Sequence, residues 1–230
     1  MNTGFLGIVM LDTRFPRLPG DIGNPDSLSM PARRVVVAGA WPDKVVQSAK
    51  GLRAAQLLKP FVSVVRQLER DGAAAITTSC GFLVLLQREL QAAVHVPVVT
   101  SSLLLLPALL REQRQVGVLT ISARRLGEEH LRSAGVPRER LADVLVQGVD
   151  ADGEFAGAIL GNRAGMDVGR ASHEVVAAAQ ALKTRAPGLN TVVLECTNMP
   201  PYREAIEQAT GLRVLSLLDS PVLRRVFPPD

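Results

Sequence analysis

The sequence predicts an α/β protein built from two halves of similar design. Short apolar runs alternate with longer helical patterns along all 230 residues, which favours parallel sheets flanked by helices over a β-sandwich. Hydrophobic residues make up 47% of the chain and charged residues 21%, as is ordinary for a globular protein that buries a core. The length is enough for one large domain or two small ones.

The first half is expected to hold four strands and two stretches of helix. The strands are predicted over 7–11, 34–38, 73–78 and 96–100, and the helices over 43–70, broken at Pro60, and over 82–93. Between the first two strands lies the segment 15–32, which is rich in proline and glycine and cannot form a regular helix. A loop of this length inside a compact domain is usually functional or disordered.

The second half follows a similar order. Its strands are predicted over 116–121, 143–147, 191–194 and 214–217, and its helices over 123–134, 170–185 and 201–210. The segment 150–169 contains five glycines and is expected to be a loop that could include a helical turn. The main difference between the halves is the connection between their first two strands, which is a helix in the second half and the Pro/Gly loop in the first.

The two halves form an internal repeat that contains both cysteines of the chain. Gly7 aligns with Gly117, an offset of 110 residues (117 − 7), and Cys80 aligns with Cys196, an offset of 116 (196 − 80). Each cysteine is followed 18 residues later by a valine of the next predicted strand, Val98 or Val214 (98 − 80 and 214 − 196). Alternation of strands and helices alone does not explain why the two cysteines fall at equivalent positions.

Matched thiols at the ends of two strands indicate acid–base chemistry. In parallel α/β sheets, ligands bind beyond the carboxyl ends of the strands, where Cys80 and Cys196 are predicted. The following helix start offers free N–H groups and a positive field, which is expected to lower a thiol pKa from about 8.5 towards neutrality. One thiol could remove a proton from a substrate carbon, and the other could return a proton from the opposite face. This chemistry requires no metal and no organic cofactor, and none is expected.

Small polar residues near the predicted strand ends suit a carboxylate ligand. Their hydroxyl, amide and backbone groups can donate hydrogen bonds to it, and Asp12 could hold a substrate ammonium group or orient a thiol. The residues expected to bind substrate on these grounds are Asp12, Thr13, Thr78, Ser79, Thr120, Thr197 and Asn198.

Other sites that contain cysteine are less consistent with the sequence. Two buried structural cysteines are the plain alternative, because free cysteine is among the most buried residue types. A zinc site is disfavoured since the cysteines do not form a C-x-x-C pair and the three histidines are scattered. A hydrolase with one nucleophilic cysteine would need a nearby histidine base, but each histidine falls in or beside a predicted helix or strand.

Composition also limits the partners and the compartment. The net charge is only +4, and the most basic stretch, 124–140, also contains three glutamates, so we expect a solvated helix face and no nucleic-acid partner. The longest uncharged run, 90–110, is interrupted by two prolines and polar residues, which argues against a membrane span. With no targeting signal in view, we expect a cytoplasmic chain with reduced thiols. The sequence does not decide whether the protein forms a homo-oligomer.

These residues are similar to those of a known family. The first strand with Asp12, one cysteine in each half, and the run Leu194-x-Cys196-Thr197-x-x-Pro200 resemble the aspartate/glutamate racemase superfamily over essentially the whole chain. That superfamily includes glutamate, aspartate and hydantoin racemases, maleate isomerase and arylmalonate decarboxylase. The chain differs where Gly81 and Phe82 follow the first cysteine, since amino-acid racemases commonly have Cys-Asn-Thr there. It also has Asn198 where glutamate racemases have histidine.

The resemblance implies two pseudo-twofold α/β domains with the active site in the cleft between them. The first would span 1–100 plus 213–230 and carry Cys80, and the second would span 101–212 and carry Cys196. It implies cofactor-independent proton transfer by the two thiols, with Gly81, Phe82 and Asn198 lining the pocket and the 15–32 loop covering it.

The expected function is a racemase or epimerase of a small carboxylate, above all an acidic amino acid. An isomerase or decarboxylase of the same superfamily is the first alternative. A non-catalytic two-domain binding protein is the second, although such a module needs no matched pair of thiols.

Overall fold

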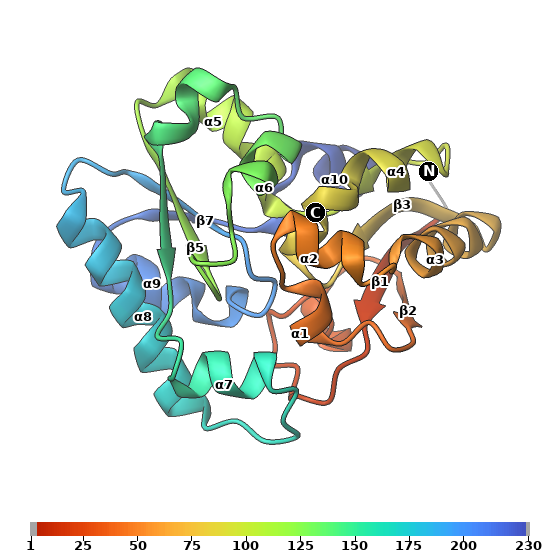
Figure 1. The fold of residues 1–230 in the computed structure, drawn as a ribbon, viewed down its shortest axis with the longest axis horizontal. Coiled ribbons are helices and arrows are strands. Elements are labelled where there is room, and N and C mark those ends of the chain that lie inside the picture. Colours follow the sequence, from red (N-terminus) through yellow and green to blue (C-terminus); the bar gives the residue numbers. More distant parts are fainter. Residues whose placement is uncertain (1–3, 229–230) are drawn as a thin grey trace.

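The computed structural model describes residues 4–228 and contains two four-stranded parallel sheets, one from each half of the chain (Figure 1). The first sheet has the order β2-β1-β3-β4, and the second has the equivalent order β6-β5-β7-β8. The strands are β1 (Phe5–Leu11), β2 (Ala32–Val37), β3 (Ala73–Thr78), β4 (Val98–Val99), β5 (Val116–Thr120), β6 (Val144–Gly148), β7 (Thr191–Leu194) and β8 (Arg213–Leu215). The predicted fold, an α/β protein with two parallel sheets, is confirmed.

The internal repeat is visible in matching backbone hydrogen bonds. Ser79 N donates to Val9 O at 3.0 Å in the first sheet, and Glu195 N donates to Leu119 O at 2.9 Å in the second. These pairs are related by offsets of 110 (119 − 9) and 116 (195 − 79), the same offsets that the sequence showed. The two cysteines, one residue further on, therefore leave their sheets at equivalent points.

The helices of the first half differ from the prediction in two places. The predicted helix over 43–70 is three helices, α1 (Pro42–Val45), α2 (Ala49–Ala54) and α3 (Leu58–Arg70). The break before α3 is at Gln56, which has a φ of 52°, whereas Pro60 lies in the first turn of α3, where a proline is tolerated. The predicted helix over 82–93 is a 3-10 segment, Gly81–Leu86, followed by α4 (Gln87–Ala92).

The second half holds α5 (Leu106–Glu112), α6 (Glu128–Ser133), α7 (Glu154–Leu160), α8 (Val168–Arg185), α9 (Arg203–Thr210) and α10 (Pro221–Val226). Shorter 3-10 segments lie at Pro25–Ser27, Ser102–Leu105, Arg138–Asp143, Pro200–Tyr202 and Leu217–Asp219. The glycine-rich segment 150–169 contains a two-turn helix, α7, whose Phe155, Ala158 and Ile159 are buried. None of the helices within residues 4–228 combines the length and the hydropathy needed to cross a membrane.

The C-terminal residues are divided between the two halves. We assigned 213–230 to the first domain, but β8 pairs with β7 and so lies in the second sheet. Beyond it, Leu217 and Leu223 pack in one cluster with Leu6, Ile8 and Val99 of the first sheet. Figure 1 accordingly shows α10, in blue, among the yellow and orange elements of the first half. The two-domain boundary stays a prediction, and these contacts favour a crossing near residue 216.

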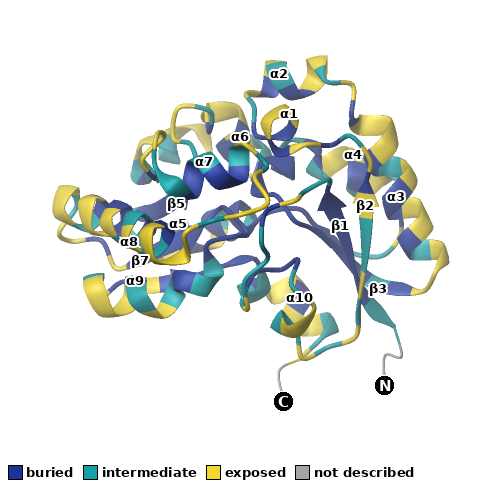
Figure 2. Ribbon diagram, turned by 90° about the horizontal axis from the view of Figure 1, so that it is seen from below, coloured by how far each residue is buried: buried dark blue, intermediate teal, exposed yellow. Residues whose placement is uncertain are grey.

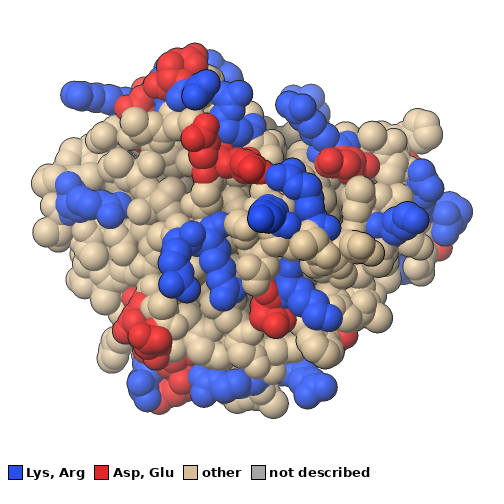
Figure 3. All heavy atoms as spheres, in the orientation of Figure 1, with Lys and Arg blue, Asp and Glu red and all other residues tan. Residues whose placement is uncertain are grey.

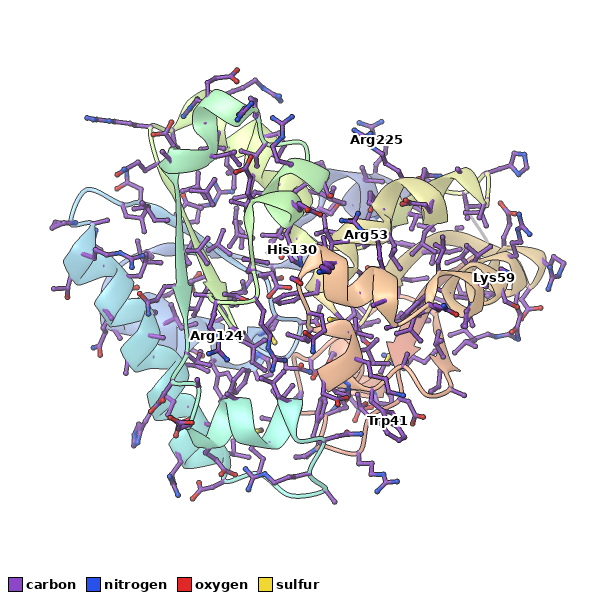
Figure 4. The ribbon with its side chains drawn as sticks, in the orientation of Figure 1. Trp41, Arg53, Lys59, Arg124, His130 and Arg225 are labelled. Carbon is purple, nitrogen blue, oxygen red and sulfur yellow. The ribbon has the colours of Figure 1, made fainter. Side chains whose placement is uncertain are left out.

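The sheets are buried and the helices that flank them are exposed on one side (Figure 2). The inner strands are buried, with Val9 and Val118 fully so, whereas the edge strands β2 and β6 are mostly half-buried or exposed. On the face shown in Figure 3, lysine and arginine side chains are spread among acidic ones and do not merge into one basic surface. The two halves also meet at α2 and α6, where Arg53 forms an ion pair with Glu129 at 2.8 Å, and Figure 4 labels Arg53 beside His130 there.

Candidate active site

Both cysteines line one pocket where the two halves meet. The cavity has about 20 Å³ of room for the centres of water-sized molecules, so its lining side chains nearly fill it. The lining residues come from the ends of the central strands, from the 15–32 loop and from α1 and α7. They are Leu11, Phe15, Pro42, Val46, Ser79, Cys80, Gly81, Phe82, Ile121, Ile159, Glu195, Cys196, Thr197 and Asn198.

The first cysteine is held by hydrogen bonds at the end of β3. The Thr78 hydroxyl donates to Thr100 O at 2.7 Å, and Leu11 N donates to Ser79 Oγ at 2.9 Å. These two bonds tie the residues before Cys80 to both neighbouring strands. Cys80 itself is extended (φ −155°, ψ 118°) and stands directly before the 3-10 segment that begins at Gly81.

The second cysteine lies at the end of β7 and is linked to the first half. The thiol of Cys196 donates to Asn198 Oδ1 at 3.6 Å, and Asn198 Nδ2 donates to the carboxylate of Asp21. The Thr197 hydroxyl donates to Ser79 O at 2.7 Å, so the two cysteine loops are directly bonded to one another. The repeat thus brings the two matched loops together across the interface between the halves.

Four of the residues expected to bind substrate do not line this pocket. The Asp12 carboxylate accepts from Gly39 N at 3.0 Å and from the Trp41 indole at 3.3 Å. The Thr13 hydroxyl accepts from Arg17, and the Thr78 hydroxyl is bonded within the sheet. Thr120 donates to Glu195 and not to the cavity. The other predicted residues, namely Ser79, Gly81, Phe82, Thr197 and Asn198, do line it.

The 15–32 loop is ordered and folds over the site. Its Phe15 is buried and lines the pocket. Asp21, which is 2% exposed, forms an ion pair with Arg17 at 3.0 Å and accepts from Asn198 of the second half. Gly20, with a φ of 97°, lies so close to Pro201 that a Cβ would be 3.2 Å from the Pro201 Cα. The loop therefore joins the two halves and encloses the pocket.

Glu195 is the site residue that sequence reasoning did not select. It is 1% exposed, lines the pocket and receives a 2.7 Å hydrogen bond from the Thr120 hydroxyl. Its signal in the sequence is a charged residue placed between the apolar run Val192-Val193-Leu194 and Cys196. Among residues 4–228, no cluster of three histidine, cysteine or acidic side chains could hold a metal ion.

The thiols of the site are more basic than the helix-terminus argument predicted. Burial and the nearby Glu195 carboxyl raise the pKa of Cys80 to about 12, and the same two causes hold the pKa of Cys196 well above its usual range. Burial also raises the pKa of Glu195 to about 7, against the opposing effect of the Thr120 hydrogen bond. Exclusion of water thus outweighs the N–H groups that follow each cysteine.

Comparison with known proteins assigns the family. The model of the Asp/Glu/Hydantoin racemase family matches residues 29–222. The chain belongs to this family. Its resemblance to the racemase superfamily is thereby confirmed, and with it the place of this chain among enzymes. Which reaction it catalyses is a separate question, because members of this superfamily include racemases, isomerases and decarboxylases.

The curated proteins whose sequences are similar to this chain are named as lyases. The chain is 30% identical over 222 residues to the dimethylsulfoniopropionate lyase of Durusdinium sp. clade D, with 94% of this chain and 72% of that protein covered. It is 32% identical over 225 residues to dimethylsulfoniopropionate lyase 5 of Emiliania huxleyi, with 94% of this chain covered. The chain spans only 44% of that second relative's length.

Solved structures of family members share the fold at lower identity. Unliganded arylmalonate decarboxylase matches with a TM-score of 0.58 and 16% identity, covering 99% of this chain and 95% of that one. An aspartate racemase homologue from Pyrococcus horikoshii matches with a TM-score of 0.57 and 17% identity, covering 97% of each chain. These structural similarities show that the chain shares its fold with both proteins.

Proposed function

We propose that this protein is a cofactor-independent lyase that removes an α-proton from a short carboxylate and expels a leaving group from the β-carbon. The observation that carries the proposal is the position of Cys80 and Cys196, which come from equivalent points of two halves and line one pocket. One thiol, as its thiolate, can supply the base that such a reaction needs, and the other can donate a hydrogen bond that stabilises the charge developing on the substrate.

The walls of the pocket favour a substrate with an apolar or cationic substituent. Much of the lining is apolar, including Leu11, Phe15 and Ile121. Among the described lining residues none is lysine, arginine or histidine, so a second carboxylate on the substrate would have no cationic side chain there. A cationic group could instead lie against the Phe15 or Phe82 ring and near the Glu195 carboxylate.

Dimethylsulfoniopropionate has the required groups, and the named relatives support it as the substrate. It carries one carboxylate, acidic hydrogens on the adjacent carbon and a dimethylsulfonium group on the next. Removal of an α-proton and cleavage of the Cβ–S bond leave acrylate, with the bonding electrons on neutral dimethyl sulfide. The carboxylate would be received by the Ser79 hydroxyl, which accepts from Leu11 N and has its own proton to donate, and by the second amide hydrogen of Asn198.

Racemisation of an acidic amino acid is the second candidate. The matched thiols favour it, because inversion at carbon requires a base on one face and an acid on the other. The apolar lining disfavours it, since aspartate and glutamate would place their second carboxylate in the pocket without a basic partner.

The experiment incubates the wild-type protein with dimethylsulfoniopropionate in buffered heavy water, and separately with single enantiomers of aspartate and glutamate. Dimethyl sulfide is measured by headspace gas chromatography, acrylate and α-deuterium by proton NMR, and enantiomers by chiral chromatography. We expect equal amounts of dimethyl sulfide and acrylate. Racemised, α-deuterated amino acid without dimethyl sulfide would establish the second candidate and overturn the first.

A further inference from the structure

One carboxylate oxygen in the pocket has no partner. Glu195 is the one acidic side chain among the described residues that line the pocket, and its Oε2 accepts from Thr120. Its Oε1 is buried and has no hydrogen-bond partner in residues 4–228. A buried carboxylate oxygen without a donor costs free energy, and such an exception in a folded protein calls for an explanation.

The position of this oxygen relates it to both thiols. Glu195 directly precedes Cys196, and its Oε1 lies over Gly81, the residue that follows Cys80. A Cβ at Gly81 would overlap both Oε1 and the backbone oxygen of Glu195, so the approach depends on the glycine. The carboxyl group is therefore held between the two cysteine loops.

The internal repeat does not account for this carboxyl group. The position equivalent to Glu195 in the first half is Ser79, since both donate the same backbone hydrogen bond to the central strand. The Ser79 hydroxyl is occupied by the amide of Leu11. Only one of the two matched loops thus carries an acid, which indicates that the two thiols perform different steps.

We infer that Glu195 accepts the proton of Cys80, and that Cys196 remains a thiol that donates a hydrogen bond to the substrate. In this transfer the S–H bond of Cys80 breaks, an O–H bond forms at Glu195 Oε1, and the negative charge moves from the carboxylate to the sulfur. The proton passes directly or through one water. The transfer is a property of the free protein, and its part in turnover rests on the proposed function.

The contacts of the two thiols decide which one is deprotonated. The backbone N–H groups of Phe82 and Leu83 and the Arg17 guanidinium all favour the anion at Cys80, against the larger effects of burial and Glu195. At Cys196 only the backbone N–H of Asn198 favours the anion, while Glu195 and Asp21 disfavour it, and the thiol proton is used in the hydrogen bond to Asn198 Oδ1. The amide orientation is fixed, because Asn198 Nδ2 donates to a carboxylate that can only accept.

Three other charged or titratable side chains lie near the thiols, namely Arg17, Asp21 and Tyr202. From the 15–32 loop, Arg17 and Asp21 form an ion pair at 3.0 Å, in which Arg17 favours an anion at Cys80 and Asp21 disfavours one at Cys196. From the segment Pro200–Tyr202, the Tyr202 hydroxyl stays neutral, since burial raises its pKa to about 12. The closed site therefore needs an acceptor of its own, because both thiols are only 7% exposed and bulk water does not take their protons.

The test is the alkylation of Cys80 by iodoacetamide in the Cys196→Ser variant, in which Cys80 is the one remaining cysteine. Rates are measured by mass spectrometry between about pH 5 and pH 9, a range that includes the raised pKa of Glu195 and the ordinary thiol pKa of about 8.5. No substrate is present, so failure of the proposed function does not affect the result.

We expect the rate to rise about tenfold per pH unit up to about pH 7 and then to level off. Above about pH 7, Glu195 and Cys80 together hold one negative charge. That charge resides on Glu195 in most molecules and on the Cys80 sulfur in a small fraction that does not change with pH. In Cys196→Ser/Glu195→Gln the levelling disappears, and the rate keeps rising about 100-fold from pH 7 to pH 9. The conservative Glu195→Asp variant keeps the levelling, and Thr120→Val moves it to higher pH.

Levelling that persists with glutamine at position 195, or that is absent with glutamate there, overturns the inference. Infrared difference spectra between about pH 5 and pH 9 decide the matter if the thiol is not alkylated. A protonated-carboxyl band that titrates near pH 7 and is missing in Glu195→Gln supports the inference, and the absence of such a band in the wild type contradicts it.

Discussion

The Glu195 carboxyl group occupies the space into which a side chain at Gly81 would project. A Cβ at Gly81 would overlap Glu195 Oε1 and the Glu195 backbone oxygen, although the two residues are 114 positions apart (195 − 81). The loop after the first cysteine and the residue before the second are therefore packed as one unit. This contact places an acid between the thiols.

Gly81→Ala should displace that carboxyl group. We expect a loss of about 1–3 kcal/mol in the free energy of unfolding, as for other overpacked sites, measured by urea denaturation. Gly169→Ala is the matched control, because Gly169 is exposed in α8, where alanine is a better helix former. Equal stability of Gly81→Ala and wild type would show that the site is looser than described.

The 15–32 loop is expected to depend on Asp21. Asp21→Asn removes the charge that pairs with Arg17 and accepts from Asn198, and it leaves a largely buried guanidinium without its partner. We expect a destabilisation of about 3 kcal/mol, read from the midpoint of chemical denaturation. Asp26→Asn, an exposed change in the same loop, should have almost no effect. Similar midpoints for both variants would contradict the linking role of Asp21.

The free energy of unfolding should decrease as pH rises, because the pKa of Glu195 is raised in the folded state. Its pKa is raised from 4.5 to about 7 by burial, so between these values the folded state holds a proton that the unfolded state has lost. Linkage then makes the free energy of unfolding decrease as pH rises from about 4.5 to 7, by about 3.4 kcal/mol at most. Glu195→Gln should gain stability relative to wild type over this window. A difference between the two proteins that does not change with pH would rule out a buried, titrating Glu195.

Sequence patterns were sufficient for the fold and for the thiol pair. The strands could be predicted because apolar periodicity is a property of local sequence. The offsets of 110 and 116 residues recur in the backbone hydrogen bonds from Ser79 to Val9 and from Glu195 to Leu119, because both halves repeat the same unit. The convergence of Cys80 and Cys196 in one pocket followed from the same symmetry.

Contacts between distant segments could not be predicted in this way. Asp12 ends the first strand, as expected, but its carboxylate is taken by Gly39 and Trp41 of the next loop. The approach of Asp21 to Asn198 joins residues 177 positions apart in sequence. The basicity of the thiols depends on burial, which arises only once both halves and the loop have closed on the site.

The central claim is that the two thiols act on one substrate in different roles, with Cys80 as the base. It is tested most directly with Cys80→Ser and Cys196→Ser, by following dimethyl sulfide release and α-deuterium exchange of dimethylsulfoniopropionate in heavy water. We predict that Cys80→Ser loses both signals by at least about 100-fold, whereas Cys196→Ser, which keeps the base, slows both signals by a smaller factor. Wild-type rates of dimethyl sulfide release in either variant would contradict the account.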